Sequence, residues 1–399
     1  MSAATLQPLD PASLRHILGQ HAQYKIGRPG GRLANLSYID LTDMKLEGVD
    51  LSDANLTGAR LYGAALRDVN FMRANLFGCD LRNADLRFAR LDRADLRGAS
   101  LRGANLTAAS LVGCDLREGL IAFKDDKAGL RLMKHEKRAG ELDYAVMTGA
   151  DLSGARMTGT QAVATDFHDA NLSGAIMTGS KLRNANLSGA VLTGADLSSA
   201  DVTGADMRGA VMVNTMLSGC NLKAADTTGS LNAPLTVFID DRPLDELMAE
   251  HELWCRTGGG KGTRHAFGGV DFRLIRNMQK RILTALEAQE ACFYDQDMSG
   301  IEMQGANLIN ADLRRCNLEG ADLRGARLMG AKLTHANLAS AKLGPLDLGG
   351  GRMMRSDLTR AHLSHANLRH ADLTRARMLE TTVEHVKDDG AIYTLTERA

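Results

Sequence analysis

A five-residue period runs through positions 84–103 of this chain and constrains its fold more than any other feature. Every fifth residue there is Leu, Ala stands two positions before each Leu, and, apart from Phe88, the rest are polar, charged or Gly. A period of five fits neither the 3.6-residue repeat of an α-helix nor the two-residue alternation of a flat strand. Leu and the preceding Ala share strand parity, so both can point to one side of a short extended segment. The other residues face outward or turn a corner, where Gly98 and Gly103 can adopt positive φ.

Four such units bring the chain round a square, so that the fifth unit lies on the first. Residues twenty apart in the sequence should then stack about 4.8 Å apart through strand hydrogen bonds. One coil buries too few apolar side chains to offset the entropy of ordering its backbone, so neighbouring coils must stabilise each other. The period therefore predicts a solenoid.

The repeated Ala-Asp-Leu-Arg units resemble the pentapeptide-repeat family, whose pattern is Ala-(Asp/Asn)-Leu-x-x. The resemblance implies an all-β solenoid, a right-handed quadrilateral β-helix, here with short α-helical caps and linkers. Some members of this family resemble DNA and protect DNA gyrase from quinolones. Those members are strongly acidic and often have Phe at the repeat centres, and this chain departs from them in its charge and in its Leu centres.

The charge balance argues against two classes of partner. The 399 residues include 48 basic and 48 acidic ones, which is atypical of a strongly basic nucleic-acid binder and of a strongly acidic DNA mimic.

The N-terminus shows no basic segment followed by an apolar core, and no apolar run reaches the length of a membrane span. We therefore expect a cytoplasmic protein that has no membrane partner.

Breaks in the period divide the chain into seven segments, and one of them repeats the N-terminus. His21 and Tyr24 correspond to His251 and Trp254, each pair on a helical face that is followed by a Gly-rich stretch. We infer an internal duplication of helix, Gly-rich turn and solenoid. The expected order is a helical cap at 1–32, β-helix at 33–118, a basic loop insertion at 119–140, β-helix at 141–232, a helical linker or cap at 233–269, a second β-helix at 270–385 and a C-terminal tail at 386–399.

Residues 270–295 fit two structures. A helical face can be drawn through them, yet Met278 and Leu283 lie in frame with the later centres, so we favour degenerate coils. The main objection is that Arg276 and Arg281 would fall at inward positions. The tail that follows the last repeats is expected to cover the open edge of the β-helix.

Two features are candidate contacts for a partner: the basic loop and the columns of Arg on the first β-helix. Long loops on repeat scaffolds are often functional, and Arg residues twenty apart should stack and attract an anionic partner. The alternatives are a solvated loop and solvated faces balanced by neighbouring Asp. The candidate residues are Lys124, Lys127, Arg131, Lys134, Lys137 and Arg138 in the loop and Arg82, Arg87, Arg97 and Arg102 in the columns.

The other clusters of polar residues do not match the patterns of known catalytic or binding sites. The stretch 258–263 is rich in Gly but lacks the Lys-Ser/Thr pair and the preceding strand of a phosphate loop. The Asp columns offer repeated surface positions instead of two carboxylates in unlike environments. Four His near the C-terminus face outward with no pair twenty apart, so no metal site is expected: His335, His362, His365 and His370. We expect no catalytic residue, cofactor or metal.

The leading hypothesis is a non-enzymatic scaffold that presents a rigid solenoid to an unknown protein partner. One alternative, implied by the family resemblance, is a DNA-mimic-like modulator of DNA gyrase or topoisomerase. Another is nucleic-acid binding along the Arg columns. Association of copies through the solenoid ends is a further expectation.

Overall fold

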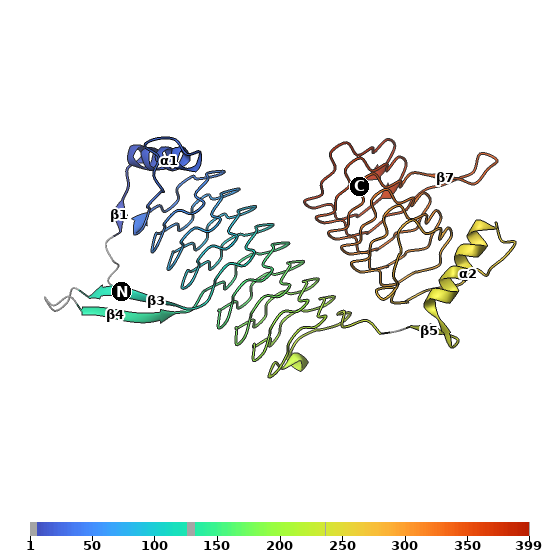
Figure 1. Cartoon of the computed structure of the whole chain (residues 1–399), viewed down its shortest axis with the longest axis horizontal. Coiled ribbons are helices and arrows are strands. Elements are labelled where there is room, and N and C mark those ends of the chain that lie inside the picture. The colour runs from blue at the N-terminus through green and yellow to red at the C-terminus, as the bar shows by residue number, and fades with distance from the viewer. Residues whose placement is uncertain (1–5, 126–131, 236, 399) are drawn as a thin grey trace. The chain divides into compact units, whose positions relative to one another are not determined.

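The computed structural model describes residues 6–125, 132–235 and 237–398. The chain forms two compact units, Met1–Ala233 and Pro234–Ala399. Each unit carries one helix near its start and continues as a column of four-sided coils (Figure 1). The solenoid predicted from the five-residue period is confirmed, as is the right-handed quadrilateral β-helix that the family resemblance implies.

Successive coils pair through short parallel bridges between residues twenty apart. Asn35 pairs with Asn55, and Asn55 pairs with Asn75. Between these bridges the N–H of Leu56 donates to the carbonyl of Asn75 at 2.8 Å. Leu56 itself has no exposed surface, because the centre of each repeat points into the column. The core of each unit is therefore a narrow stack of Leu and Ala held together by backbone hydrogen bonds from coil to coil.

Two sequence features form the turns between the flat sides of each coil. Gly98, at the second corner position, has a φ of 65°, as the sequence predicts. In addition, many centres are preceded by Asp or Asn, whose side chain accepts a hydrogen bond from the backbone N–H two residues on. Oδ1 of Asp50 accepts from the N–H of Ser52 at 2.9 Å, and Oδ1 of Asn105 accepts from the N–H of Thr107 at 3.0 Å. These Asx turns explain why the repeat selects Asp and Asn at this position.

At the small inward position, usually Ala, a polar side chain can donate to a carbonyl of the preceding coil. Sγ of Cys79 donates to the carbonyl of Leu56 at 2.9 Å, and Oγ1 of Thr165 donates to the carbonyl of Leu142 at 2.7 Å. Burial raises the pKa of the Cys79 thiol to about 12, and the Cys residues of the chain are free thiols. Ser180 occupies the same kind of position, but its buried Oγ has no hydrogen-bond partner among the described residues.

Helix α1 (Pro11–Lys25) packs against the first coil of the first unit. Asp10 caps it, with Oδ1 accepting from the N–H groups of Ala12 and Ser13, both at 2.9 Å. Leu14 and His21 are its buried residues. Strand β1 (Gln7–Pro8), just before the helix, pairs in parallel with β2 (Ile39–Asp40) in the first coil.

Helix α2 (Leu244–Arg256) has the same role in the second unit. Leu247, Met248 and His251 are buried on it, and Pro243 occupies its N-cap position. Two antiparallel strands lead into it, β5 (Phe238–Ile239) and β6 (Arg242–Pro243). The last coils of the first unit, before this cap, include the short 3-10 helix η1 (Leu222–Ala224).

The insertion at 119–140 is a β-hairpin, which corrects the expected loop. Strands β3 (Gly119–Asp125) and β4 (Leu132–Arg138) pair antiparallel and project from the first unit (Figure 1). The coil continues across the insertion, since Ser100 pairs with Glu141, forty-one positions on instead of twenty. The two arms leave and re-enter the coil at one corner, so they lie side by side and pair.

A second, shorter hairpin interrupts the second unit. Strands β7 (Leu346–Asp347) and β8 (Met353–Met354) pair antiparallel around a Gly-rich turn. The coil again closes across it, because Arg327 pairs with Asp357, thirty positions on. From this point the register of the second unit is shifted by ten residues.

Residues 270–295 form coils. Asp271 pairs with Cys292, and Ile282 pairs with Glu302. The two Arg residues do not enter the core: Arg276 is exposed, and Nε of Arg281 lies 3.3 Å from Oε2 of Glu252 on α2.

The C-terminal residues continue the solenoid, which corrects the expected separate tail. Lys387 pairs with Asn367 and Ile392 pairs with Asp372, each twenty positions apart. Strand β10 (Glu397–Arg398) pairs in parallel with β9 (Arg377–Met378). The backbone pairing that stacks the earlier coils therefore continues to the end of the described chain, although the repeat pattern in the sequence is weak there.

Candidate interaction faces

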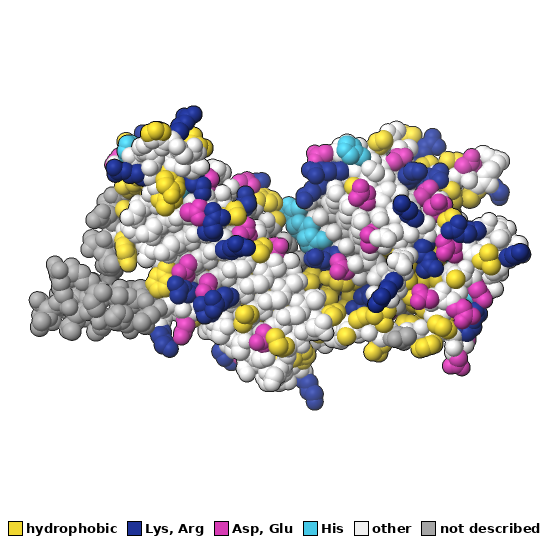
Figure 2. Space-filling model, viewed as in Figure 1, with side chains coloured by type: hydrophobic (Ala, Val, Ile, Leu, Met, Phe, Trp, Pro, Cys, Tyr) yellow, Lys and Arg dark blue, Asp and Glu magenta, His cyan; other side chains and the backbone are white. Residues whose placement is uncertain are grey.

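The Arg columns of the first unit are largely neutralised by the Asp two residues earlier. Nε and Nη2 of Arg82 both lie 2.7 Å from the carboxylate oxygens of Asp80. Arg87 holds Asp85 in the same two-pronged way, and its hydrogen bonds keep the pKa of Asp85 below the ordinary value. Arg97 pairs with Asp95 at 2.9 and 2.7 Å. Figure 2 shows the result on its visible face, where basic side chains are interspersed with acidic ones.

Aromatic rings support the outer ends of these Arg side chains. The guanidinium of Arg82 lies 5.6 Å from the ring centroid of Tyr62, and that of Arg102 lies 5.4 Å from the ring of Tyr144. Arg102 stands two positions after Ser100, where Arg82, Arg87 and Arg97 each have an Asp. Its positive charge is therefore not neutralised in this way. A shallow depression lies at this face, lined by Thr42, Arg60, Tyr62, Asp80 and Arg82. The repulsion expected between stacked Arg residues is thus reduced by the Asp residues two positions earlier in the sequence. Little positive charge is left to attract an anion.

The basic residues of the hairpin fall into two groups. Lys127 and Arg131 lie outside the described residues, and Lys124 and Lys134 belong to β3 and β4, of which the structure describes the backbone at these positions. At the root, Nζ of Lys137 lies 3.3 Å from Glu118, and Nη2 of Arg138 lies 4.0 Å from Glu141.

Glycines hold the hairpin close to the coil. A Cβ on Gly119 would lie 3.0 Å from the carbonyl oxygen of Arg97 and from the ring of Phe77. A Cβ on Gly140 would overlap the carbonyl oxygen of Leu116. Only Gly allows so close an approach of two backbones at both ends of the insertion. The sequence contains these glycines, but nothing in its period marks them.

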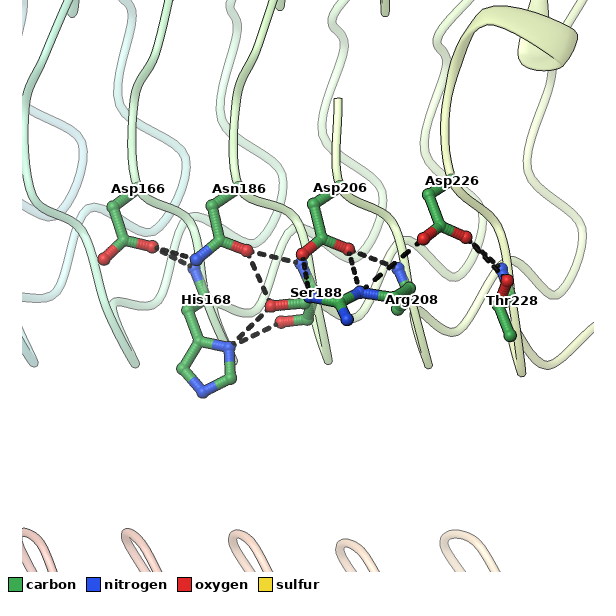
Figure 3. Close-up of polar contacts among 8 residues, drawn as sticks. All are labelled: Asp166, His168, Asn186, Ser188, Asp206, Arg208, Asp226 and Thr228. Carbon is green, nitrogen blue, oxygen red and sulfur yellow. Dashed lines mark hydrogen bonds and ion pairs between the residues drawn. The ribbon is translucent and has the colours of Figure 1, made fainter. Parts of the chain in front are cut away.

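A polar ladder runs along one side of the first unit (Figure 3). Its first column consists of Asp166, Asn186, Asp206 and Asp226, and its second of His168, Ser188, Arg208 and Thr228. Nδ2 of Asn186 donates to Asp166 at 2.9 Å, and Arg208 binds Asp206 at 2.6 Å. The hydrogen bonds from Arg208 lower the pKa of Asp206. The carboxylates of this ladder are hydrogen-bonded by neighbouring residues of the ladder. They therefore do not form a catalytic pair in which one carboxylate acts as the acid and the other as the base.

Three His of the second unit lie in register, which corrects the expectation that the outward His do not stack. The ring of His365 lies 4.8 Å from that of His335 and 5.0 Å from that of His385. His335 and His365 are thirty apart in sequence, and hairpin β7–β8 brings them onto adjacent coils. Counting by twenty misses the pair His335–His365, because the insertion adds ten residues, whereas His365 and His385 do lie twenty apart and the four His considered from the sequence did not include His385.

Two classes of site are not found in the described part of the chain. Among residues 6–125, 132–235 and 237–398, no group of three or more His, Cys, Asp or Glu is arranged to hold a metal ion. The stacked His rings do not converge on one point. Neither of the described α-helices has the length and apolar character needed to cross a membrane.

The sequence pattern described as pentapeptide repeats matches the chain in eight copies, over residues 34–73, 79–118, 141–179, 170–209, 185–223, 306–344 and 349–387. These ranges cover more than half of the chain. It belongs to the pentapeptide-repeat family. No curated protein matches the chain.

Solved structures of the family are similar to this chain. HetL, a pentapeptide repeat protein involved in heterocyst differentiation regulation from Nostoc sp. strain PCC 7120, is 19% identical, with 98% of this chain and 94% of HetL covered and a TM-score of 0.19. Trypsin-treated QnrB1, a plasmid-mediated fluoroquinolone resistance protein, is 20% identical over 48% of this chain and 85% of its own, with a TM-score of 0.27. Rfr23 from Cyanothece 51142 is 21% identical over 36% and 91%, with a TM-score of 0.23. At these values the likenesses carry no argument about function.

Proposed function

We propose that the chain is a non-enzymatic scaffold that presents hairpin β3–β4 to a protein partner. One observation carries the proposal: the coil closes across the insertion, with Ser100 paired to Glu141, so the fold itself does not need the hairpin. Insertions of this kind in repeat proteins lie on one face, which is often the binding face.

The mounting of the hairpin supports this role. Gly119 and Gly140 bring its two ends against the coil, and Lys137 and Arg138 each lie within ion-pair distance of an acid at the root. A binding element that is held by a rigid scaffold loses less conformational entropy when it binds than a free loop does.

The charge of the hairpin indicates the kind of partner. Residues 119–140 contain six Lys or Arg and three Asp or Glu, in a chain that is neutral overall. An excess of positive charge on a projecting element speeds association with a negatively charged surface. We therefore expect a protein that carries an acidic patch.

A pull-down with three tagged baits tests the proposal. The first bait is the full chain. The second lacks residues 119–139, which places Leu142 five positions after Leu116 and so restores the repeat. The third lacks residues 345–354, which in the same way places Leu358 five positions after Leu343. We expect a partner on the first and third baits only. Equal recovery on all three baits would contradict the role of the hairpin.

The alternative hypotheses gain no support from the described residues. Three of the four Arg proposed to bind nucleic acid are paired with Asp, which leaves little charge for phosphate contacts. Modulation of DNA gyrase rests on the family resemblance alone, and a supercoiling assay with and without quinolone tests it. The cytoplasmic location, the absence of a cofactor and association through the solenoid ends also stay predictions.

A further inference from the structure

Hairpin β3–β4 differs from the rest of the described chain in the length of its strands. β3 and β4 span seven residues each, whereas every other described strand spans two. Their pairs follow one another without a break, from Gly119 opposite Arg138 to Asp125 opposite Leu132. The two strands form a sheet of their own, so within the described residues the outer edge of each one has no partner strand.

A free strand edge of this length is suited to pair with a further strand. Such an edge presents a row of unpaired N–H and C=O groups, which folded proteins usually shield by short strands, Pro, a bulge or a covering element. Residues 119–140 contain no Pro, and the register has no bulge. A hairpin of two strands alone is also marginal in water, and a third strand adds to its stability. The hairpin is therefore open to completion from outside.

Charge selects β4 as the receiving edge and an acidic strand as its occupant. Strand β4 carries Lys134, Lys137 and Arg138 against Glu136, whereas β3 carries one Lys and one Asp. Like charges on paired strands repel each other, and opposite charges attract. The same edge of a second copy is therefore disfavoured, and a strand rich in Asp or Glu is favoured.

The ion pairs at the root of the hairpin leave its cations accessible to such a strand. Nζ of Lys137 lies 3.3 Å from Glu118, but the two side chains are 74% and 57% exposed. Nη2 of Arg138 lies 4.0 Å from Glu141. Exposed ion pairs contribute little to stability, so carboxylates on a strand beside β4 can compete for both cations.

We propose that hairpin β3–β4 binds its partner by strand addition, in which an extended acidic segment of the partner pairs with the outer edge of β4. This inference rests on the proposed function and specifies how the hairpin holds the partner. In this mode the main-chain hydrogen bonds supply the affinity, and the side chains of alternate residues supply the specificity.

Two synthetic peptides test the proposal. The first is a capped heptapeptide of alternating Glu and Val. The second has the same sequence with N-methyl groups on two adjacent central residues, which removes one N–H from each edge of the strand and leaves the charge unchanged. We expect the first peptide to bind the full chain at low salt, and the second to bind at least tenfold more weakly. The first should also bind at least tenfold more weakly to the chain without 119–139, and unchanged to the chain without 345–354.

Amide exchange followed by NMR on the full chain measures the pairing itself. Successive residues of a strand direct their N–H groups to opposite edges. Addition of the first peptide should therefore slow exchange most at every second residue of β4. Equal slowing at all residues of β4, or none, would contradict strand addition.

Three binding results would also overturn strand addition: equal binding of the two peptides, binding that survives the loss of 119–139, and no binding of the first peptide to the full chain. A dimer of the free chain that is lost with 119–139, measured by analytical ultracentrifugation, would assign the edge to a second copy and contradict the acidic segment. The proposed function fails on a different result, a captured partner that is retained without 119–139. A partner that is lost with this deletion, together with equal binding of the two peptides, would remove strand addition alone.

Discussion

The backbone N–H of Ala34 donates a hydrogen bond of 3.1 Å to Nδ1 of His21, a side chain with no exposed surface. The second unit repeats this relationship, since the N–H of His265 lies 3.4 Å from Nδ1 of His251. Each cap helix is thus joined to the first coil through a buried imidazole that must be neutral at Nδ1. The duplication inferred from the sequence therefore extends to the hydrogen bond that connects helix and solenoid.

Acid should weaken the first unit through this contact. Burial lowers the pKa of His21 below 6.5, so on acidification the unfolded chain takes up the proton first. Stability is then complete above about pH 6.5 and falls as the pH drops further. The variant H21Q should show a shallower fall in the unfolding free energy of this unit between pH 7.5 and 5. The control H16Q, at an exposed position on the same helix, should keep the natural slope. An unchanged slope in H21Q would contradict the cap contact.

The hairpin root should tolerate no side chain at Gly140. Gly140→Ala places a Cβ against the carbonyl of Leu116, which has no room to move because it lies in the coil. We expect a loss of about 2 kcal/mol in unfolding free energy, typical of overpacking. Gly19→Ala is the control: nothing lies near its Cβ on α1, so it should stabilise the unit by about 0.5–1 kcal/mol. Denaturant melts measure both, and equal effects would be inconsistent with the packing described.

Ser180→Ala should stabilise the first unit. The Oγ of Ser180 is buried without a partner, and Ala occupies the equivalent position in most repeats. Removing an unsatisfied hydroxyl should raise the unfolding free energy by about 1 kcal/mol. Thr165→Ala is the matched comparison, because it removes a hydroxyl that donates to Leu142 at 2.7 Å and should not stabilise. A loss of stability in Ser180→Ala, measured by urea unfolding, would show that the hydroxyl has a partner.

Two ion pairs of the same geometry should differ in their contribution. Arg314 binds Asp312 at 2.7 Å and Arg324 binds Asp322 at 2.6 Å, but the side chain of Arg314 is 6% exposed and that of Arg324 is 42% exposed. Arg314→Ala leaves a nearly buried carboxylate unpaired and should cost about 3 kcal/mol. Arg324→Ala should cost about 1 kcal/mol or less, because the Arg324 side chain is largely in solvent and the equally buried Asp322 keeps a hydrogen bond from Nε2 of Gln304 at 3.0 Å. Similar costs in thermal melts of the two variants would contradict the difference in burial.

The fold could be predicted because its determinants are local and repeated. The parity of Leu and Ala, the Gly at corners such as Gly98 and the matching cap residues His21 and His251 all lie in plain sequence order. The sequence also predicts solvated faces in which neighbouring Asp residues balance the Arg columns, and Asp80 and Arg82, two positions apart, form such a pair.

The remaining features depend on insertions, whose closure cannot be counted from the repeat alone. Hairpin β7–β8 adds ten residues between adjacent coils, so His335 meets His365 and the rule of twenty fails. Likewise, the contact of Gly140 with Leu116 exists only because the first hairpin returns to the corner that it left. Tertiary closure, not local propensity, decides these contacts.

The most direct measurement of the central claim is the affinity of the captured partner for three purified chains: the full chain, the chain without 119–139 and the chain without 345–354. Both deletions restore the five-residue frame, so each chain should fold, and circular dichroism and melting check this. The account predicts that loss of the first hairpin weakens binding at least tenfold, while loss of the second leaves it unchanged. Equal affinity of all three chains for the partner would contradict it.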